Sequence, residues 1–230
     1  MGTPRWFQRF WLPAAILFVY LYSFPYFDQI HSANELPRIY LTMAMVDRGA
    51  LDIEVELRRY QETPDTSTYA GKRYSNKAPG MSLLTVPVYW VLKRLNGGAP
   101  PALPRLFYWF RLLGNILPSL LFLLLLARWL RAVVDDERLR RLLLAGYALG
   151  TMALIYGSLL IAHQLSGLLA ATGFFLLCLW ARGQGGRFTP LWAGLAAFSI
   201  SFAPAVVSAI AFSCCSTDQN ETAMLTIVSP

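Results

Sequence analysis

Charged residues are scarce in this sequence of 230 residues: they make up 14% of the chain, whereas hydrophobic residues make up 56%. Soluble domains usually carry about 25% charged residues, so the composition excludes a soluble enzyme and a disordered tail. The 20 Lys and Arg give a formal net charge of +7, but they stand in short clusters beside apolar runs. Because they form no continuous basic face, we expect no nucleic-acid partner.

Cysteine is also scarce, since the chain has only Cys178, Cys214 and Cys215. These three residues have no metal-ligand spacing and cannot form a set of paired disulfides. The sequence therefore predicts no metal site and no cofactor. Internal repeats and low-complexity tracts are missing as well, which excludes repeat architectures.

Long apolar runs are what the sequence does contain, and they predict an all-α membrane protein. A membrane-spanning helix needs about 20 apolar residues. Five runs meet or approach this length, and we expect them to be transmembrane helices: 10–27, 106–127, 142–161, 165–181 and 190–212. A cleaved signal peptide is the alternative for the first run, but its end, Ser23-Phe24-Pro25-Tyr26-Phe27, has bulky aromatics instead of a small-residue cleavage site.

The positive-inside rule sets the expected orientation. With residues 1–9 in the cytoplasm, the arginine clusters at 128–141 and 182–187 also fall inside. The run 81–92 contains Pro87 and would span only about 18 Å as a helix, against about 30 Å of hydrocarbon, so we expect it at the interface. This arrangement predicts a multi-pass protein of the cytoplasmic (inner or plasma) membrane. No expected span contains an acid that could couple ions, which disfavours a transporter.

The external loop over 28–104 holds eight of the thirteen acids. Loops of this length are usually functional. Two short interfacial helices are expected in it, at about 34–48 and 81–94. The first should be capped by Asn34, carry Pro37 in its first turn and end at Gly49. Its apolar stripe should lie on the membrane, with the opposite side solvated; the stripe is Leu36, Ile39, Tyr40, Met43 and Val46.

Two further segments of the loop have recognisable patterns. Residues 51–57 alternate strictly between apolar and acidic, which predicts a short strand with a solvated acidic edge. The segment 71–80 is basic, aromatic and rich in turn residues. Its cations could bind a lipid phosphate or simply meet anionic head groups, and the composition leaves both open.

These features together resemble a known family. An acid follows the first span, an arginine stands three residues later, and the runs Met43-Ala44-Met45-Val46-Asp47-Arg48-Gly49-Ala50-Leu51 and Gly71-x-Arg73-Tyr74-x-x-Lys77-x-Pro79 follow in order. The chain over about 10–182 is similar to the N-terminal part of the GT-C glycosyltransferases. It is most similar to the family of protein mannosyltransferases, aminoarabinose transferases and bacterial relatives that modify lipopolysaccharide. The resemblance implies transfer of a sugar from a polyprenyl-phosphate carrier on the external membrane face.

The resemblance also implies roles for individual residues. Glu35 matches an acid of the family's first-loop pair, which acts as the base or orients the acceptor, and Asn34 stands where an aspartate is common. Lys77 would contact the phosphate of the lipid-linked sugar, with Arg73 and Tyr74 lining the approach. A fixed cation stabilises the leaving phosphate while a carboxylate accepts the acceptor's proton.

Three more residues are placed less specifically by the sequence. Arg38 is the arginine that follows the acid, and we count it with the substrate-binding residues. His163 lies in the external turn before the fourth span, where it is either an interfacial polar residue or part of the site. Arg111 lies inside the second span, where it either snorkels to the surface, which we favour, or faces the protein interior.

The C-terminal residues change in character. From about Ala203 the chain loses all Lys and Arg, and residues 213–230 form an atypical tail. We expect a truncated or frameshifted end. The function predicted is therefore a polyprenyl-phosphate-sugar-dependent glycosyltransferase, or its N-terminal portion, in contact with membrane lipid. The alternative is a non-catalytic membrane subunit that binds the lipid-linked sugar or an unidentified partner chain.

Overall fold

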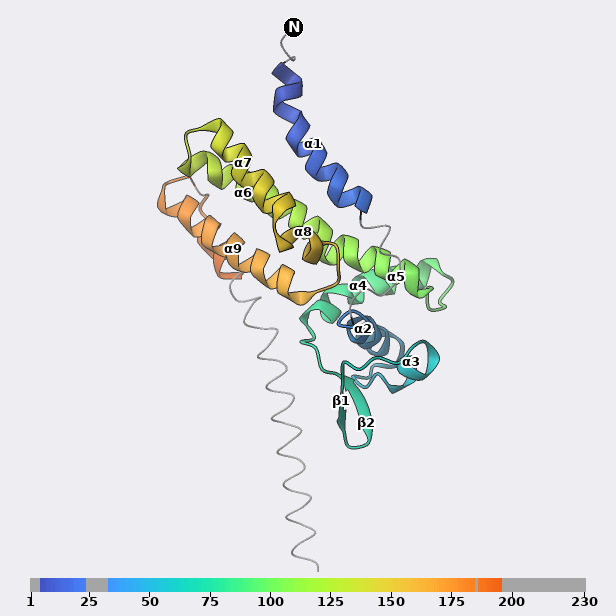
Figure 1. Ribbon diagram of the computed structural model, residues 1–230. Helices are drawn as coiled ribbons and strands as arrows, with labels where there is room; N and C mark the ends of the chain where they lie inside the picture. The colour runs from blue at the N-terminus through green and yellow to red at the C-terminus, as the bar shows by residue number, and fades with distance from the viewer. Residues whose placement is uncertain (1–4, 24–32, 185, 196–230) are drawn as a thin grey trace, which may run out of the picture.

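The computed structural model describes residues 5–23, 33–184 and 186–195, which are mostly helical (Figure 1). Its named helices and strands, in chain order, are α1 (Arg5–Ser23), α2 (Leu36–Arg48), α3 (Glu54–Arg59), β1 (Thr66–Tyr69), β2 (Lys72–Ser75), α4 (Gly80–Leu95), α5 (Leu103–Arg111), the π-helix η2 (Leu112–Ile116), α6 (Leu117–Val133), α7 (Glu137–Gly150), α8 (Met152–Gly157) and α9 (Ala162–Ala181).

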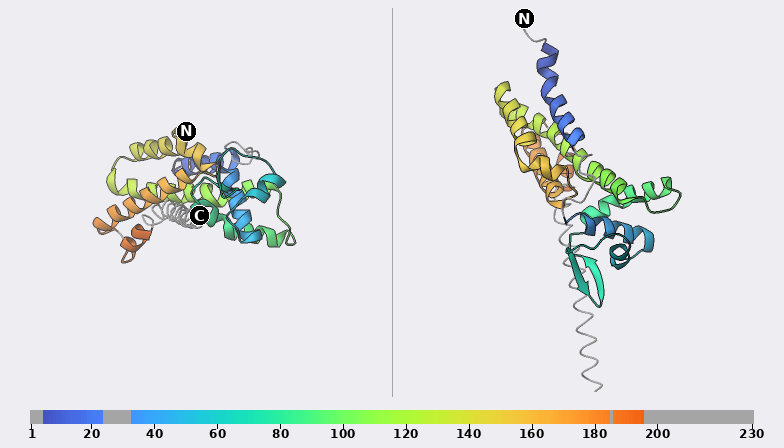
Figure 2. Two further views of the ribbon diagram at one scale, coloured as in Figure 1. Left: turned by 90° about the horizontal axis from the view of Figure 1, so that it is seen from below. Right: turned by 45° about the vertical axis from the view of Figure 1, so that its right-hand side comes forward.

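These elements form two parts, each with its own buried apolar cluster. The helix bundle contains α1, α6, α7 and α9, and its cluster includes Tyr20, Phe122 and Leu168. The other part contains α2, α3, the β1–β2 hairpin and α4, and we call it the external module because it lies within the loop expected outside the membrane. Its cluster includes Tyr40 and Tyr89. Helix α5 and η2 continue directly into α6, so one long helix joins the two parts (Figures 1 and 2).

Within the described ranges, two helices are long and apolar enough to cross a membrane: the continuous helix Leu103–Val133 and α9. They contain the expected spans 106–127 and 165–181. The apolar part of α1 is shorter, at Phe10–Tyr22. Of the expected span 190–212, only the residues up to 195 lie in the described part of the chain, and the atypical tail at 213–230 lies outside it.

The expectation of one unbroken helix over 142–161 was wrong. Helix α7 ends at Gly150, and Thr151 has extended backbone, with φ −120° and ψ 173°. Its hydroxyl then caps α8 by accepting a hydrogen bond from the Ala153 amide at 3.2 Å. A threonine oxygen satisfies an amide that has no partner within its own helix, which favours a new helix start at this position.

Helix α2 confirms the expected end at Gly49, which adopts the left-handed conformation with φ 63°. Pro37 lies in the first turn, as expected. The expected cap at Asn34 was wrong, because the cap position is Glu35, whose side chain makes no capping bond. The solvated face was also wrong: Leu36–Ala44 are all buried, because the hairpin, α3 and α4 cover α2.

The expected strand at 51–57 was wrong. Helix α3 occupies Glu54–Arg59, with acids in its first turn and arginines in its last, an order that complements the helix dipole. Ile53 and Leu57, four residues apart, are the buried pair. The strands come later: β1 and β2 pair through a two-residue turn in which Ala70 and Gly71 have φ of 46° and 72°. Two positive φ values match the hairpin turn that fits the twist of antiparallel strands.

Candidate functional site at the junction of the two parts

Glu35 and Arg111 form a buried ion pair between the external module and the long helix. The Arg111 Nε donates to Glu35 Oε1 at 2.8 Å, and Arg111 Nη2 donates to Oε2 at 2.9 Å. The two side chains are 0% and 1% exposed. The Arg111 guanidinium also lies over the ring of Phe107, with 4.9 Å to its centroid. Arg111 therefore faces the protein interior, and the expectation that it snorkels was wrong.

A third segment joins this pair. The Leu160 amide donates to Glu35 Oε1 at 2.8 Å, and Leu160 lies in the turn between α8 and α9. One carboxylate thus holds the start of α2, the end of α5 and the turn before α9. We call the contact among Glu35, Arg111 and Leu160 the junction.

Asn115, on the π-helix η2, donates hydrogen bonds to the same turn between α8 and α9. Its Nδ2 donates to the Ile161 carbonyl at 3.1 Å and also to the Leu159 carbonyl. The side chain is fully buried, and its Oδ1 has no hydrogen-bond partner within the described residues. Short π-helical segments widen the backbone spacing and are frequent at functional sites. Here η2 directs Asn115 toward the carbonyls on either side of the junction amide.

Arg38 lies one turn into α2 and is only 4% exposed. Its Nη1 donates to the Asn34 carbonyl, while its Nε is buried with no hydrogen-bond partner in the described part of the chain. Burial lowers the pKa of the Arg38 guanidinium, and the nearby carboxylates of Asp65 and Glu35 act in the opposite direction. A buried cation with an unused donor is suited to an anionic ligand.

Lys77 is the second cation of this region, and it is paired with Asp65. Its Nζ lies 3.1 Å from Asp65 Oδ1, and its side chain is 20% exposed. Asp65 is also the carboxylate that acts on Arg38. Asp65 thus pairs with Lys77 and also acts electrostatically on Arg38, as Glu35 does, and we call these four residues the charged region.

Arg73 and Tyr74 lie on β2, further along the hairpin. Arg73 Nε contacts Glu54 Oε2 at 2.8 Å, and its Nη2 contacts Glu62 Oε1 at 3.1 Å. These hydrogen bonds raise the pKa of Arg73. Tyr74 is half-buried and pairs with Asp52 in a β-bridge. Arg73 would have to leave two carboxylates before it could bind a phosphate.

His163 is the second residue of α9, three positions beyond Leu160. Its side chain is exposed, whereas the next residue, Gln164, is buried and donates from Nε2 to Ser119 Oγ at 3.3 Å. His163 thus stands near the junction in sequence but on the outer side of its helix. No group of three His, Cys, Asp or Glu suited to a metal ion occurs among the residues that the structure describes.

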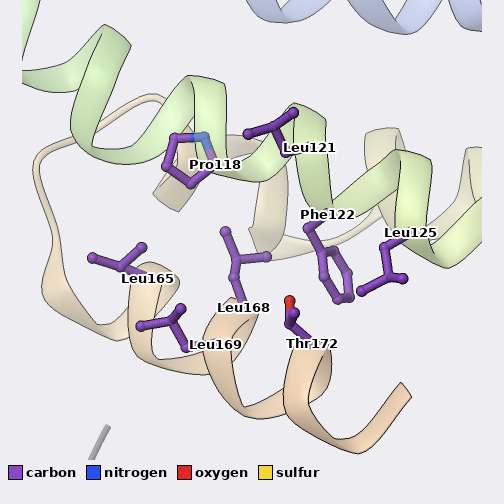
Figure 3. Close-up of a pocket in the computed structure, with 8 residues that line it drawn as sticks. All are labelled: Pro118, Leu121, Phe122, Leu125, Leu165, Leu168, Leu169 and Thr172. Carbon is purple, nitrogen blue, oxygen red and sulfur yellow. The ribbon is translucent and has the colours of Figure 1, made fainter. Parts of the chain in front are cut away.

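An apolar groove begins directly beyond the junction, between α6 and α9 (Figure 3). It has a volume of about 220 Å³, and Thr172 provides its only polar side chain. Pro118, Leu121, Phe122 and Leu125 line it from α6, and Leu165, Leu168, Leu169 and Thr172 line it from α9. The groove is open on one side, since Leu121 is 57% exposed.

Sequence reasoning missed the two amide groups of this region, Asn115 Nδ2 and the Leu160 backbone N–H. It considered Arg111 but gave it no partner. One signal was available: an arginine inside an apolar run needs a carboxylate or carbonyl partner. The only acid in the first part of the external loop next to a helix start was Glu35, 76 residues away. Nothing in the local pattern marks Leu160, because a backbone amide has no sequence signature.

No protein-family model matches this chain, and no curated protein or solved structure matches it either.

Proposed function

We propose that this chain acts on a sugar carried by polyprenyl phosphate at the external membrane face, as a glycosyltransferase or as the N-terminal portion of one. The observation that carries the proposal is the charged region beside the junction. Arg38 is a buried cation with an unused Nε donor, and Lys77 approaches it through the shared carboxylate of Asp65. In the transfer, an acceptor hydroxyl oxygen bonds to the sugar C1 and the C1–O bond to phosphate breaks. The hydroxyl proton passes to a carboxylate base or to the departing phosphate, and the cations stabilise that phosphate.

The proposal includes five transmembrane helices, an N-terminus in the cytoplasm and an inner or plasma membrane location. The positions of the arginines support this orientation. Arg128 Nη2 donates to the Gln184 carbonyl at 3.4 Å, and Arg182 Nη1 donates to the Ala132 carbonyl at 2.6 Å. These contacts join the ends of α6 and α9 that lie away from the junction. The arginines of the short connections between these helices thus lie at the end of the bundle opposite the external module, where the positive-inside rule expects them.

Under this proposal, Glu35 acts either as the general base or as a residue that orients α2. Its two oxygens are engaged by Arg111 and Leu160, and it has no exposed surface. A general base must reach the proton that it removes. These contacts favour the orienting role, in which Glu35 fixes the start of α2 and so fixes Arg38.

The alternative is a membrane subunit that binds the lipid-linked sugar without transferring it. Asn34 favours this alternative, because an amide stands where the family commonly has an aspartate. An amide is not a proton acceptor at neutral pH. Both readings require the phosphate to bind at Lys77, and they differ in whether sugar is transferred.

Binding of undecaprenyl phosphate to the full chain in detergent micelles tests what both readings share. We expect Lys77→Ala to weaken binding by at least about tenfold, which corresponds to about 1.4 kcal/mol. Lys72→Ala is the matched control, because Lys72 is exposed on the same hairpin. Equal binding by the two variants would reject the phosphate site. Transfer of a radiolabelled sugar from the lipid to membrane acceptors then separates enzyme from binding subunit.

A paired variant tests the role of Glu35. Glu35→Gln with Arg111→Met removes both charges, while the Gln oxygen can still accept from the Leu160 amide. If Glu35 orients α2, the folded double variant should keep donor binding and, in a transfer-competent preparation, most of its transfer. Loss of transfer with intact binding would make Glu35 the base.

A further inference from the structure

Helix α4 is apolar on two opposite faces. One face packs against α2 and α5, and it includes Met81, Tyr89 and Leu92. The other face is uncovered by the described chain, although its side chains are large: Leu83, Leu84, Pro87, Trp90, Val91 and Leu95. These positions follow helical spacing and form one stripe, which we call the α4 stripe. Helices that are apolar all round are normally covered on all sides, so the stripe needs a partner.

The position of α4 indicates the depth of the stripe. The helix Leu103–Val133 has 31 residues and is therefore about 46 Å long, which exceeds the hydrocarbon core of about 30 Å. Its first part, α5, carries the exposed aromatics Tyr108 and Trp109. Tyrosine and tryptophan concentrate at the membrane interface. Helix α4 contacts α5 and lies between it and α2, so it occupies the level where the spans meet the external module (Figures 1 and 2).

Two arginines beside the α4 stripe favour a membrane surface that contains anionic lipids. The Arg94 guanidinium lies over the ring of Trp90, 4.4 Å from its centroid. Arg105, at the start of α5, is exposed and donates only weakly, to Asn96 Oδ1 at 3.4 Å. Neither arginine has a salt bridge within the described ranges. Arginines next to an apolar stripe attract anionic head groups.

We propose that the α4 stripe inserts into the bilayer interface and that Arg94 and Arg105 bind anionic lipid head groups beside it. Helix α2 has no such contact, because its apolar residues are buried within the module. The stripe thus fixes the height of the external module above the spans. This inference does not depend on the sugar chemistry.

Site-directed spin labelling of the full chain in lipid nanodiscs tests the proposal. Val91 and Val55 are a matched pair, since their side chains are 47% and 49% exposed on α4 and α3 respectively. Each is changed to Cys after Cys178, Cys214 and Cys215 are changed to Ser. We expect the label at 91 to be more accessible to oxygen than to a water-soluble nickel complex, and the label at 55 to show the reverse. Water accessibility at 91 would overturn the proposal, and so would exclusion of both reagents, which would indicate a protein partner.

Lipid charge supplies the second readout. The depth of the label at 91 should increase when phosphatidylglycerol replaces part of the phosphatidylcholine. Arg94→Gln with Arg105→Gln should remove this dependence while the label stays in lipid. A depth that responds equally in both proteins would show that these arginines are not the head-group ligands.

Discussion

The contact between α2 and α4 differs in chemistry from the contact between α6 and α9. In the external module, hydroxyls cross the interface: Thr42 Oγ1 and Thr85 Oγ1 lie 2.8 Å apart, and Ser82 Oγ donates to the Arg38 carbonyl at 2.9 Å. In the bundle, rings stack, with Trp129 and Phe175 centroids 4.5 Å apart. Lipid tails are as apolar as these side chains, so helix contacts between spans depend on packing. The module combines apolar burial with hydroxyl partners along the α2–α4 contact, whereas the buried bond from Gln164 Nε2 to Ser119 Oγ at 3.3 Å lies at the start of α9, near the junction.

The junction is where these two kinds of packing meet, and it should give the largest effect. Arg111→Gln leaves the Glu35 carboxylate buried without its cation, which should cost about 3–5 kcal/mol of stability. Thermal unfolding in detergent micelles measures the loss. Arg105→Gln is the control on the same helix, and it should change stability by less than about 0.5 kcal/mol because Arg105 is exposed. Similar losses in both variants would contradict a special role for Arg111.

Asn115 should give the next largest effect. Asn115→Leu leaves the carbonyls of Leu159 and Ile161 without their donor, and unsatisfied buried groups cost about 1–3 kcal/mol each. We expect a loss of about 2–4 kcal/mol in unfolding experiments. Asn115→Asp should not restore full stability, because an ionised carboxylate donates no hydrogen bond and a protonated one donates only one, whereas two carbonyls need a donor. Full stability of the Asp variant would mean that these bonds do not form.

The external module should also lose stability at high pH. Burial raises the pKa of Tyr40 to about 12, and burial together with the hydrogen bond to Asp47 raises the pKa of Tyr89. Unfolded tyrosine has a pKa of about 10. Because the pKa of these tyrosines is higher in the folded than in the unfolded protein, their contribution to the stability of the folded state is complete below pH 10. This contribution is lost as the pH rises toward 12. Tyr89→Phe should therefore flatten the profile of unfolding free energy against pH above pH 10, and an unchanged slope in this variant would contradict the prediction.

The smallest effect is expected at the surface of α3. Arg58 is 76% exposed and pairs with Glu54 within one helix, so Arg58→Ala should cost at most about 0.5 kcal/mol. Arg48 pairs with the nearly buried Glu56 at 2.8 Å, and Arg48→Ala should cost more. Chemical denaturation of the two variants provides the comparison. Equal losses would show that burial of Glu56 does not strengthen its pair.

The sequence predicted elements that depend on local pattern. The helices containing the apolar runs at 106–127 and 165–181, the helix at about 81–94 and the end of α2 at Gly49 all agree with the structure. Prediction from the sequence failed where contacts with a segment far away in the chain determined the local structure. The alternation at 51–57 fits a strand, but burial of Ile53 and Leu57 against the module favours a helix. Glu35 and Arg38 appeared solvated because the hairpin and the turn at Leu160 that cover them lie far away in the chain.

The roles of Glu35, Lys77, Arg73, Tyr74, Arg38 and His163 remain predictions of the resemblance. The structure adds their partners. Arg38 keeps a buried Nε donor with no partner among the described residues, whereas Arg73 is already engaged by Glu54 and Glu62. Polar partners of this kind could not be derived from spacing, because salt bridges between distant segments leave no periodic signal.

A double-mutant cycle on Glu35 and Arg111 tests most directly whether one ion pair holds the external module on the spans. Unfolding free energies are measured for the original chain, Glu35→Gln, Arg111→Met and the double variant. We predict a coupling energy of at least about 2 kcal/mol, with the double variant more stable than Arg111→Met alone. Additive losses within about 0.5 kcal/mol would contradict the account, because residues that do not interact add in this way.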